Sequence, residues 1–233
     1  MTKIKVFCAR SMTVAVSRLA GDFMRESGHE VDITFGPVGT LSAKLAAGET
    51  ADVLILGAPA MAMMEQNGSF VAGTRTDVAR VFIGVAVREG AAAPDISTAE
   101  AFRKTLLGAR TIAFTDASVG GTAAVYLPVL FERMGIADEI RRKAMPQQSG
   151  GAVAEKVASG EADIGITLIP EFLPIKGASV IGKLPAALAD DTTYTAAVSA
   201  GSSVPEAGSA FIAALVRPAA RDIWQAAGFE RAG

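Results

Sequence analysis

Apolar residues recur along this chain in two alternating patterns. Short apolar runs predict strands, and the stretches between them, in which apolar residues return every three or four positions, predict helices. The runs lie at 4–9, 31–35, 53–56, 81–87, 111–115, 164–167 and 194–198; the helical stretches lie at 12–26, 40–47, 59–67, 98–107, 122–134, 152–159, 205–216 and 219–227. Such alternation indicates an α/β protein whose parallel-rich sheets are covered by helices.

A segment of the first half of the chain returns in the second half. Leu45–Ile55 reads LAAGETADVLI, and Val157–Ile166 reads VASGEADIGI, with one residue fewer. In each copy a Gly follows a predicted helix, where it can take the left-handed cap conformation, and an Asp precedes a buried strand. The repeat predicts two similar three-layer lobes, lobe 1 from residues 1–82 and 196–233 and lobe 2 from 83–195. A two-strand hinge would join them, with a ligand cleft between them.

Four segments combine small residues with hydroxyl groups at a helix start; three follow the predicted strands at 4–9, 31–35 and 111–115, and the fourth, 147–151, opens the predicted helix at 152–159. In parallel sheets, ligands bind outside the carboxyl ends of the strands, where free N–H groups and the helix dipole favour an anion. A single Ser, Thr or Gly at a helix start is also an ordinary cap, so the prediction depends on the coincidence of all four segments. The candidate ligand-binding residues are Arg10, Ser11, Met12, Gly39, Thr40, Ser118, Gly121, Thr122, Ser149, Gly150 and Thr167.

Arg10 adds a charge to the first of these segments. It precedes the predicted helix at 12–26, and a guanidinium there can grip a carboxylate through two parallel hydrogen bonds. The alternative is a solvated surface charge. The ligand class predicted from these segments is a small anion, either a carboxylate or an oxyanion.

The loops and the repeat resemble the molybdate-binding subfamily of periplasmic solute-binding proteins with the type II fold. The resemblance is carried by residues 9–13, 35–48, 51–52, 126–135 and 160–166, and so spans nearly the whole chain. It implies an oxyanion bound between two lobes and delivery to an ABC transporter. Molybdate binders have serine-rich first loops and a tyrosine after the strand that corresponds to 164–167. Here Gly36–Gly39 lacks serine and Leu168 stands at the tyrosine position, which favours a small organic acid over molybdate.

Composition limits the classes of partner that the chain is expected to bind. The net charge of -2 and the absence of a Lys/Arg-rich block argue against nucleic acid, and no apolar run is long enough to insert in a membrane. Lys3 and Lys5 interrupt the first apolar run, so no secretory leader is recognisable. The chain as written is expected in the cytoplasm, or in the periplasm with an ABC transporter as partner if a leader precedes it.

Two functions remain open. The first is a solute-binding protein or sensor; the second is a cytoplasmic isomerase that moves a double bond in a small polycarboxylate, because relatives of this fold include an isomerase of aconitate. The candidate catalytic residues are Ser11, Glu171 and Tyr126, with Asp116 as a further acid. One His and one Cys cannot supply a typical transition-metal site, and no Walker loop or GxGxxG occurs, so neither a metal nor a cofactor is predicted.

Overall fold

A computed structural model of the whole chain describes residues 1–232. Its internal contacts divide the chain into two compact units. Unit 1 comprises Met1–Arg80 and the segment from Thr192 onward, and unit 2 comprises Val81–Asp191. The chain therefore passes between the units at 80/81 and 191/192. The sequence pattern predicts these boundaries two to four residues later, at 82/83 and 195/196.

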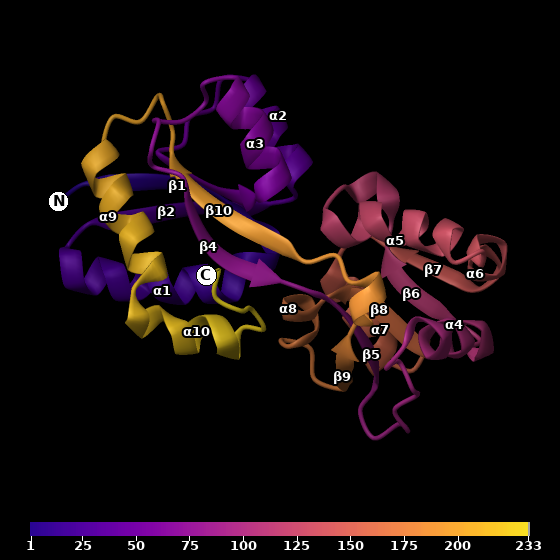
Figure 1. Cartoon of the computed structure of the whole chain (residues 1–233). Coiled ribbons are helices and arrows are strands. Elements are labelled where there is room, and N and C mark those ends of the chain that lie inside the picture. The colour runs from indigo at the N-terminus through magenta and orange to yellow at the C-terminus, as the bar shows by residue number, and fades with distance from the viewer. Residues whose placement is uncertain (233) are drawn as a thin grey trace. The chain divides into compact units, whose positions relative to one another are not determined.

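Unit 1 is built on a five-stranded sheet with the order β2-β1-β3-β10-β4 (Figure 1). Its strands are β1 (Lys3–Ala9), β2 (Glu30–Gly36), β3 (Val53–Gly57), β4 (Thr76–Val81) and β10 (Thr192–Val198). Its helices are α1 (Thr13–Ser27), α2 (Val38–Ala46), α3 (Ala58–Gln66), α9 (Pro205–Val216) and α10 (Arg221–Ala226), with 3-10 turns η1 (Arg10–Met12) and η4 (Pro218–Ala220). β1 pairs in parallel with β2 and β3, whereas β10 is antiparallel to β3.

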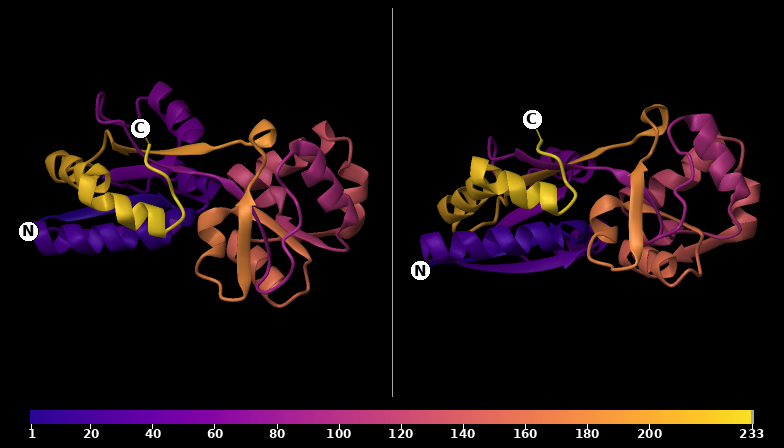
Figure 2. Two further views of the ribbon diagram at one scale, coloured as in Figure 1. Left: turned by 60° about the horizontal axis from the view of Figure 1, so that its bottom comes forward. Right: turned by 90° about the horizontal axis from the view of Figure 1, so that it is seen from below.

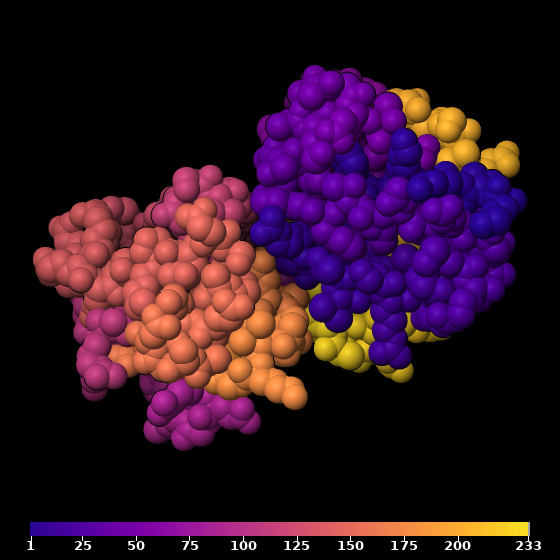
Figure 3. All heavy atoms as spheres, turned by 180° about the vertical axis from the view of Figure 1, so that it is seen from behind, coloured from indigo at the N-terminus to yellow at the C-terminus, as the bar shows by residue number. Residues whose placement is uncertain are grey.

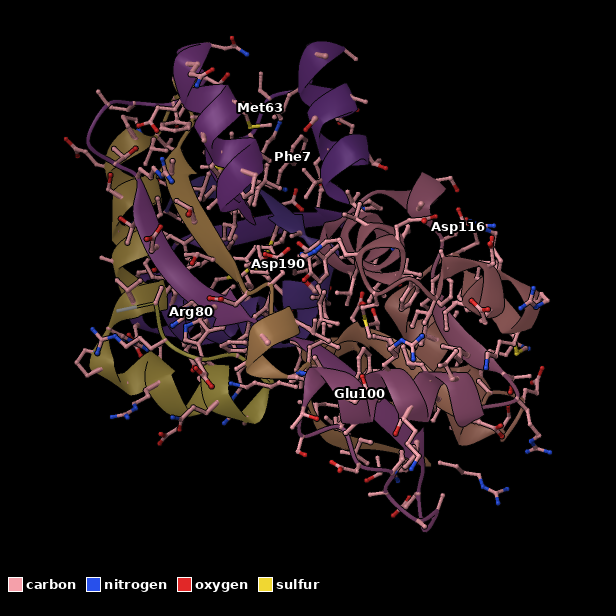
Figure 4. The ribbon with its side chains drawn as sticks, turned by 45° about the vertical axis from the view of Figure 1, so that its right-hand side comes forward. Phe7, Met63, Arg80, Glu100, Asp116 and Asp190 are labelled. Carbon is pink, nitrogen blue, oxygen red and sulfur yellow. The ribbon has the colours of Figure 1, made fainter. Side chains whose placement is uncertain are left out.

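Helices cover both faces of the unit 1 sheet. Phe7, Leu54 and Met61 belong to a buried cluster beneath α2 and α3, where Figure 4 shows Phe7. On the other face α1 contacts α9 and α10, which lie beside it in both views of Figure 2. In the space-filling view of Figure 3, yellow C-terminal atoms lie against indigo and purple N-terminal ones. The two ends of the sequence thus complete one three-layer unit.

Unit 2 has a sheet of the same size, with the order β7-β6-β8-β5-β9. Its strands are β5 (Ile83–Arg88), β6 (Ile112–Thr115), β7 (Ala144–Gln147), β8 (Ile164–Leu168) and β9 (Ala178–Lys183). Its helices are α4 (Ala99–Gly108), α5 (Thr122–Arg133), α6 (Ala137–Lys143), α7 (Gly150–Ala158) and α8 (Ile169–Phe172), with 3-10 turns η2 (Ala117–Val119) and η3 (Ala186–Leu188). Val153, Val157 and Phe172 pack on one face of this sheet. Phe131 of α5 packs against Phe114 of β6, with ring centroids 5.5 Å apart.

The repeat in the sequence corresponds to equivalent places in the two sheets. β3 and β8 each lie third in their sheet, parallel to the second strand and antiparallel to the fourth. Gly48 and Gly160 precede them with φ of 90° and 79°, a conformation that glycine adopts without steric cost. The predicted two-lobe α/β fold is confirmed, but the sheets are mixed and not parallel-rich: β6 pairs in parallel with β7 and β8, whereas β5 is antiparallel to β8 and β9.

One predicted strand is wrong as a continuous element. The apolar run at 81–87 is divided, because β4 ends at Val81 and β5 begins at Ile83, each in a different sheet. The sequence pattern also missed β4, β7, β9 and α6.

Candidate functional site

In unit 1 three helix starts lie at one edge of the sheet. β1, β2 and β3 are parallel, and each leads at once into a helical segment, namely η1 with α1, α2 and α3. Their carboxyl ends therefore bring free N–H groups of several helices to one edge. Because β10 runs antiparallel to β3, its first residues reach the same edge, and Tyr194 pairs with Gly57.

Arg10 and Ser11 lie in the turn η1, at the end of β1. Arg10 is exposed, and its side chain has no hydrogen bond or ion pair with another residue of the described part of the chain. The half-buried Ser11 has its Oγ 2.7 Å from Tyr194 Oη. Tyr194 is buried and packs edge-on against Phe229, with ring centroids 6.2 Å apart. Sequence reasoning read Tyr194 only as part of a strand and missed this contact.

The other unit 1 candidates differ in what they can offer. Met12 has a fully buried side chain, so only its backbone can reach a ligand. Gly39 and Thr40 are exposed in the first turn of α2. A Cβ added at Gly39 would meet nothing within 4 Å, so the backbone of that turn is open to an approaching group.

Unit 2 also has three helix starts at one edge of its sheet, but they carry different side chains. The parallel strands β6, β7 and β8 lead into η2 with α5, α7 and α8. Thr167, at the end of β8, is fully buried; its hydroxyl donates to Glu171 Oε2 at 2.7 Å and lies 3.4 Å from the Thr115 hydroxyl. A Cβ added at Gly150 would overlap Glu171 Oε2. Thr167, Glu171 and Gly150 therefore meet at the start of α7.

Ser118 is hydrogen-bonded to its neighbour Asp116, which is labelled in Figure 4. Asp116 Oδ1 accepts the Ser118 hydroxyl at 2.5 Å and the Ser118 N–H at 2.8 Å. These hydrogen bonds favour the ionised carboxylate and hold the pKa of Asp116 below its usual value. The Ser118 hydroxyl is thus not a spare donor. At the start of α5 a Cβ added at Gly121 would meet nothing within 4 Å, so the backbone there is open, and the neighbouring Thr122 is half-buried.

The remaining unit 2 candidates have local structural partners. Ser149 caps α7, its Oγ accepting from Ala152 N at 3.1 Å. Tyr126 lies one turn into α5, and its hydroxyl donates to the Leu188 carbonyl oxygen at 2.9 Å. The Tyr126 hydroxyl is therefore engaged with a backbone group of the same unit.

Other features of the structure contribute nothing to this edge. A hollow of about 770 Å³ in unit 2 is lined by Val87 and Ile164, at the opposite edge of the sheet from the helix starts. No group of three or more His, Cys, Asp or Glu side chains within residues 1–232 could hold a metal ion. Within the same range, every helix is too short or too polar to cross a membrane.

Comparisons with known proteins agree with this architecture. Residues 4–230 match the model of a family described as bacterial extracellular solute-binding protein. The substrate-binding domain of a putative molybdenum ABC transporter from Clostridium difficile superposes with a TM-score of 0.82 over 100% of both chains, at 17% identity. The type II fold predicted from the resemblance is thereby confirmed.

Two curated proteins resemble the chain along most of its length. An aconitate isomerase from a Pseudomonas species is 31% identical over 220 residues, which cover 91% of this chain and 81% of that protein. The molybdate-binding protein ModA of Escherichia coli (strain K12) is 25% identical over 230 residues, covering 97% of this chain and 88% of that protein.

Proposed function

Because this chain belongs to the family of bacterial extracellular solute-binding proteins, we propose that it binds a small anion that carries carboxylate groups. The observation that supports this most directly is the edge of helix starts in each unit, with an exposed and unpaired Arg10 in the first of them. Helix N-termini stabilise negative charge through their free N–H groups. A ligand with two or three carboxylates can engage several such starts at once, and we propose that both units contribute.

The choice of a carboxylate over a tetrahedral oxyanion follows from the donors. A guanidinium matches a planar carboxylate through two parallel hydrogen bonds. An oxyanion held by neutral donors needs several free hydroxyls, but the Ser118 hydroxyl already donates to Asp116, and Gly36–Gly39 has no hydroxyl at all. These features favour an organic acid over molybdate or sulfate.

The test is a ligand screen with a matched pair of arginine variants. Calorimetry with di- and tricarboxylates, molybdate, sulfate and phosphate identifies the ligand class. Arg10→Ala removes the proposed carboxylate contact and should weaken binding by about 1.5 to 3 kcal/mol, or roughly 10- to 150-fold. Arg18→Ala is the control, since Arg18 is also exposed and lies on α1. Equal affinities for the two variants, or binding of molybdate alone, would contradict the proposal.

A second candidate function is the isomerisation of such a ligand. It is favoured by the 31% identity to an aconitate isomerase over 91% of this chain and by an acid, Glu171, at the helix-start edge of unit 2. NMR spectra of each bound carboxylate, recorded over hours with protein, separate the two functions. An unchanged spectrum supports a binding protein, and a new isomer supports an enzyme.

Location and transport partner depend on export. The family description is extracellular, which supports a periplasmic protein that delivers its ligand to an ABC transporter. The enzyme function needs no transporter and would suit the cytoplasm as well. Cell fractionation of the producing organism, with antibody detection, distinguishes the two locations.

A further inference from the structure

The carboxylate of Glu171 lies directly on the first turn of α7. Its Oε2 accepts the Thr167 hydroxyl at 2.7 Å and occupies the space where a side chain at position 150 would begin. Only glycine permits this approach, because a Cβ at Gly150 would also overlap the Glu171 carboxyl carbon. Because residue 150 is glycine, no side chain occupies the space beside the first turn of α7, and the Glu171 carboxylate of the same unit lies there.

The support behind this carboxylate is buried and specific. Thr167 is fully buried, and its hydroxyl lies 3.4 Å from the hydroxyl of Thr115, which is 7% exposed. Two adjacent parallel strands, β6 and β8, supply these hydroxyls. Glu171 itself is half-buried. The hydrogen bond from Thr167 and the contact with Gly150 therefore hold its carboxylate in a defined position at the edge of the sheet.

The other candidate acid–base groups of unit 2 have different partners. Asp116 is engaged with Ser118 and has a lowered pKa, which makes it a weak base. The Tyr126 hydroxyl donates to a backbone carbonyl. Because the Glu171 carboxylate occupies the start of α7, we expect the ligand carboxylates to bind at other helix starts and the carbon chain to lie nearer Glu171.

We propose that Glu171 is the base that moves a proton along the carbon chain of a bound unsaturated polycarboxylate, an inference that rests on the carboxylate binding proposed above. Glu171 takes a proton from a CH2 carbon next to the double bond; the C–H bond breaks and an O–H bond forms. The electron pair spreads over the double bond and the conjugated carboxylate. The proton returns at the far end of the three-carbon unit, so the double bond moves by one position and no oxidant or cofactor is consumed.

The first experiment uses trans-aconitate as probe, in D2O, with the full chain. Wild-type protein should replace the methylene protons of the probe by deuterium, followed by NMR. Glu171→Gln should bind the probe within about 3-fold of wild type by calorimetry, while exchange falls by about 10²- to 10⁴-fold, the usual contribution of a general base. Exchange by Glu171→Gln at the wild-type rate would overturn the proposal.

A matched glycine pair provides a second test that keeps Glu171 itself. Gly150→Ala displaces the carboxylate and should reduce exchange by about 10²-fold or more. Gly151→Ala adds the same methyl group one residue later, where its Cβ meets only Ser149 Oγ at 3.9 Å, and should leave exchange unchanged. Equal exchange rates for these two variants would also overturn the proposal.

The outcomes for wild type separate this inference from the binding function. If wild type binds the carboxylate without exchanging its protons, Glu171 is not a base and the binding function stands. If wild type binds no carboxylate of the panel, the proposed function fails and this inference fails with it.

Discussion

The Ser11–Tyr194 contact shows which site residues the sequence predicts and which it does not. Ser11 was predicted as a site residue from its place after a strand, at a helix start. Tyr194 carries no such signal, because the two residues are 183 positions apart and meet only through the antiparallel pairing of β10 with β3. The same holds for the close approach of Glu171 to Gly150, because these residues follow β8 and β7, two strands that are separated in the sheet by β6 and end at the same edge. Local patterns identified the polar loops, but the partners of their side chains depend on sheet order.

Substitutions at Ser11 and Tyr194 should reveal a coupled pair. Ser11→Ala and Tyr194→Phe each remove one partner of a part-buried 2.7 Å hydrogen bond and should each lower the free energy of unfolding by about 1 kcal/mol. The double variant should lose less than the sum of the two. Tyr194→Phe removes only the hydroxyl and keeps the ring that packs against Phe229. Urea unfolding of the four proteins measures the coupling, and strictly additive losses would contradict it.

At the scale of elements, the strands that sequence reasoning missed share a position. β4, β7 and β9 each lie at the edge of a sheet. An edge strand pairs on one side only and needs fewer apolar residues; β7, for example, reads AMPQ and has no fully buried residue. The central strands β3, β5 and β8 are buried along all or nearly all of their length and read as largely apolar runs, as does β1 from Val6 onward, which is why they were found.

The repeated Asp joins equivalent strands in both units. Asp52 accepts the Lys5 N–H, and Asp163 accepts the Arg110 N–H, each at 2.8 Å. Each carboxylate thus satisfies a backbone donor near the start of the neighbouring strand. Asp52→Ala and Asp163→Ala should therefore each lower stability by about 1 to 2 kcal/mol, since a hydrogen bond to a charged acceptor is lost. Urea unfolding measures both, and a loss in only one variant would mean that the two Asp residues are not equivalent.

The surroundings of Asp163 predict that its contribution to stability depends on pH. The Arg110 side chain, aided by backbone N–H groups, holds the pKa of Asp163 below its usual value. A lowered folded-state pKa means that the stabilisation is present above the usual value of about 4 and is lost as the pH falls through the folded-state pKa. The stability difference between wild type and Asp163→Asn should therefore shrink from pH 6 to pH 3. A difference that does not change with pH would exclude this electrostatic contribution.

At the scale of the whole molecule, we have proposed that both units contribute to binding one ligand. The chain crosses from one unit to the other twice. Trp224, the single tryptophan, lies in unit 1; it is 2% exposed, and its Nε1 donates to the Leu215 carbonyl at 2.8 Å. Its fluorescence therefore reports the unfolding of unit 1 alone. A ligand held by unit 1 alone would stabilise this reporter to the same extent whatever is substituted in unit 2, whereas the stabilisation by a ligand held by both units would fall when its unit 2 contacts are removed.

At 100 times its Kd, the ligand should raise the free energy of unfolding measured by Trp224 fluorescence by about 2.7 kcal/mol. Thr167→Val removes a unit 2 hydroxyl that lies at the helix-start edge, and it should reduce this ligand-induced gain if the ligand spans both units. Thr105→Val is the control, because Thr105 also lies in unit 2 but its hydroxyl donates to the Asp95 carbonyl, away from that edge. If both variants keep the full gain, the ligand is held by unit 1 alone, and the equivalent edge of unit 2 serves another purpose.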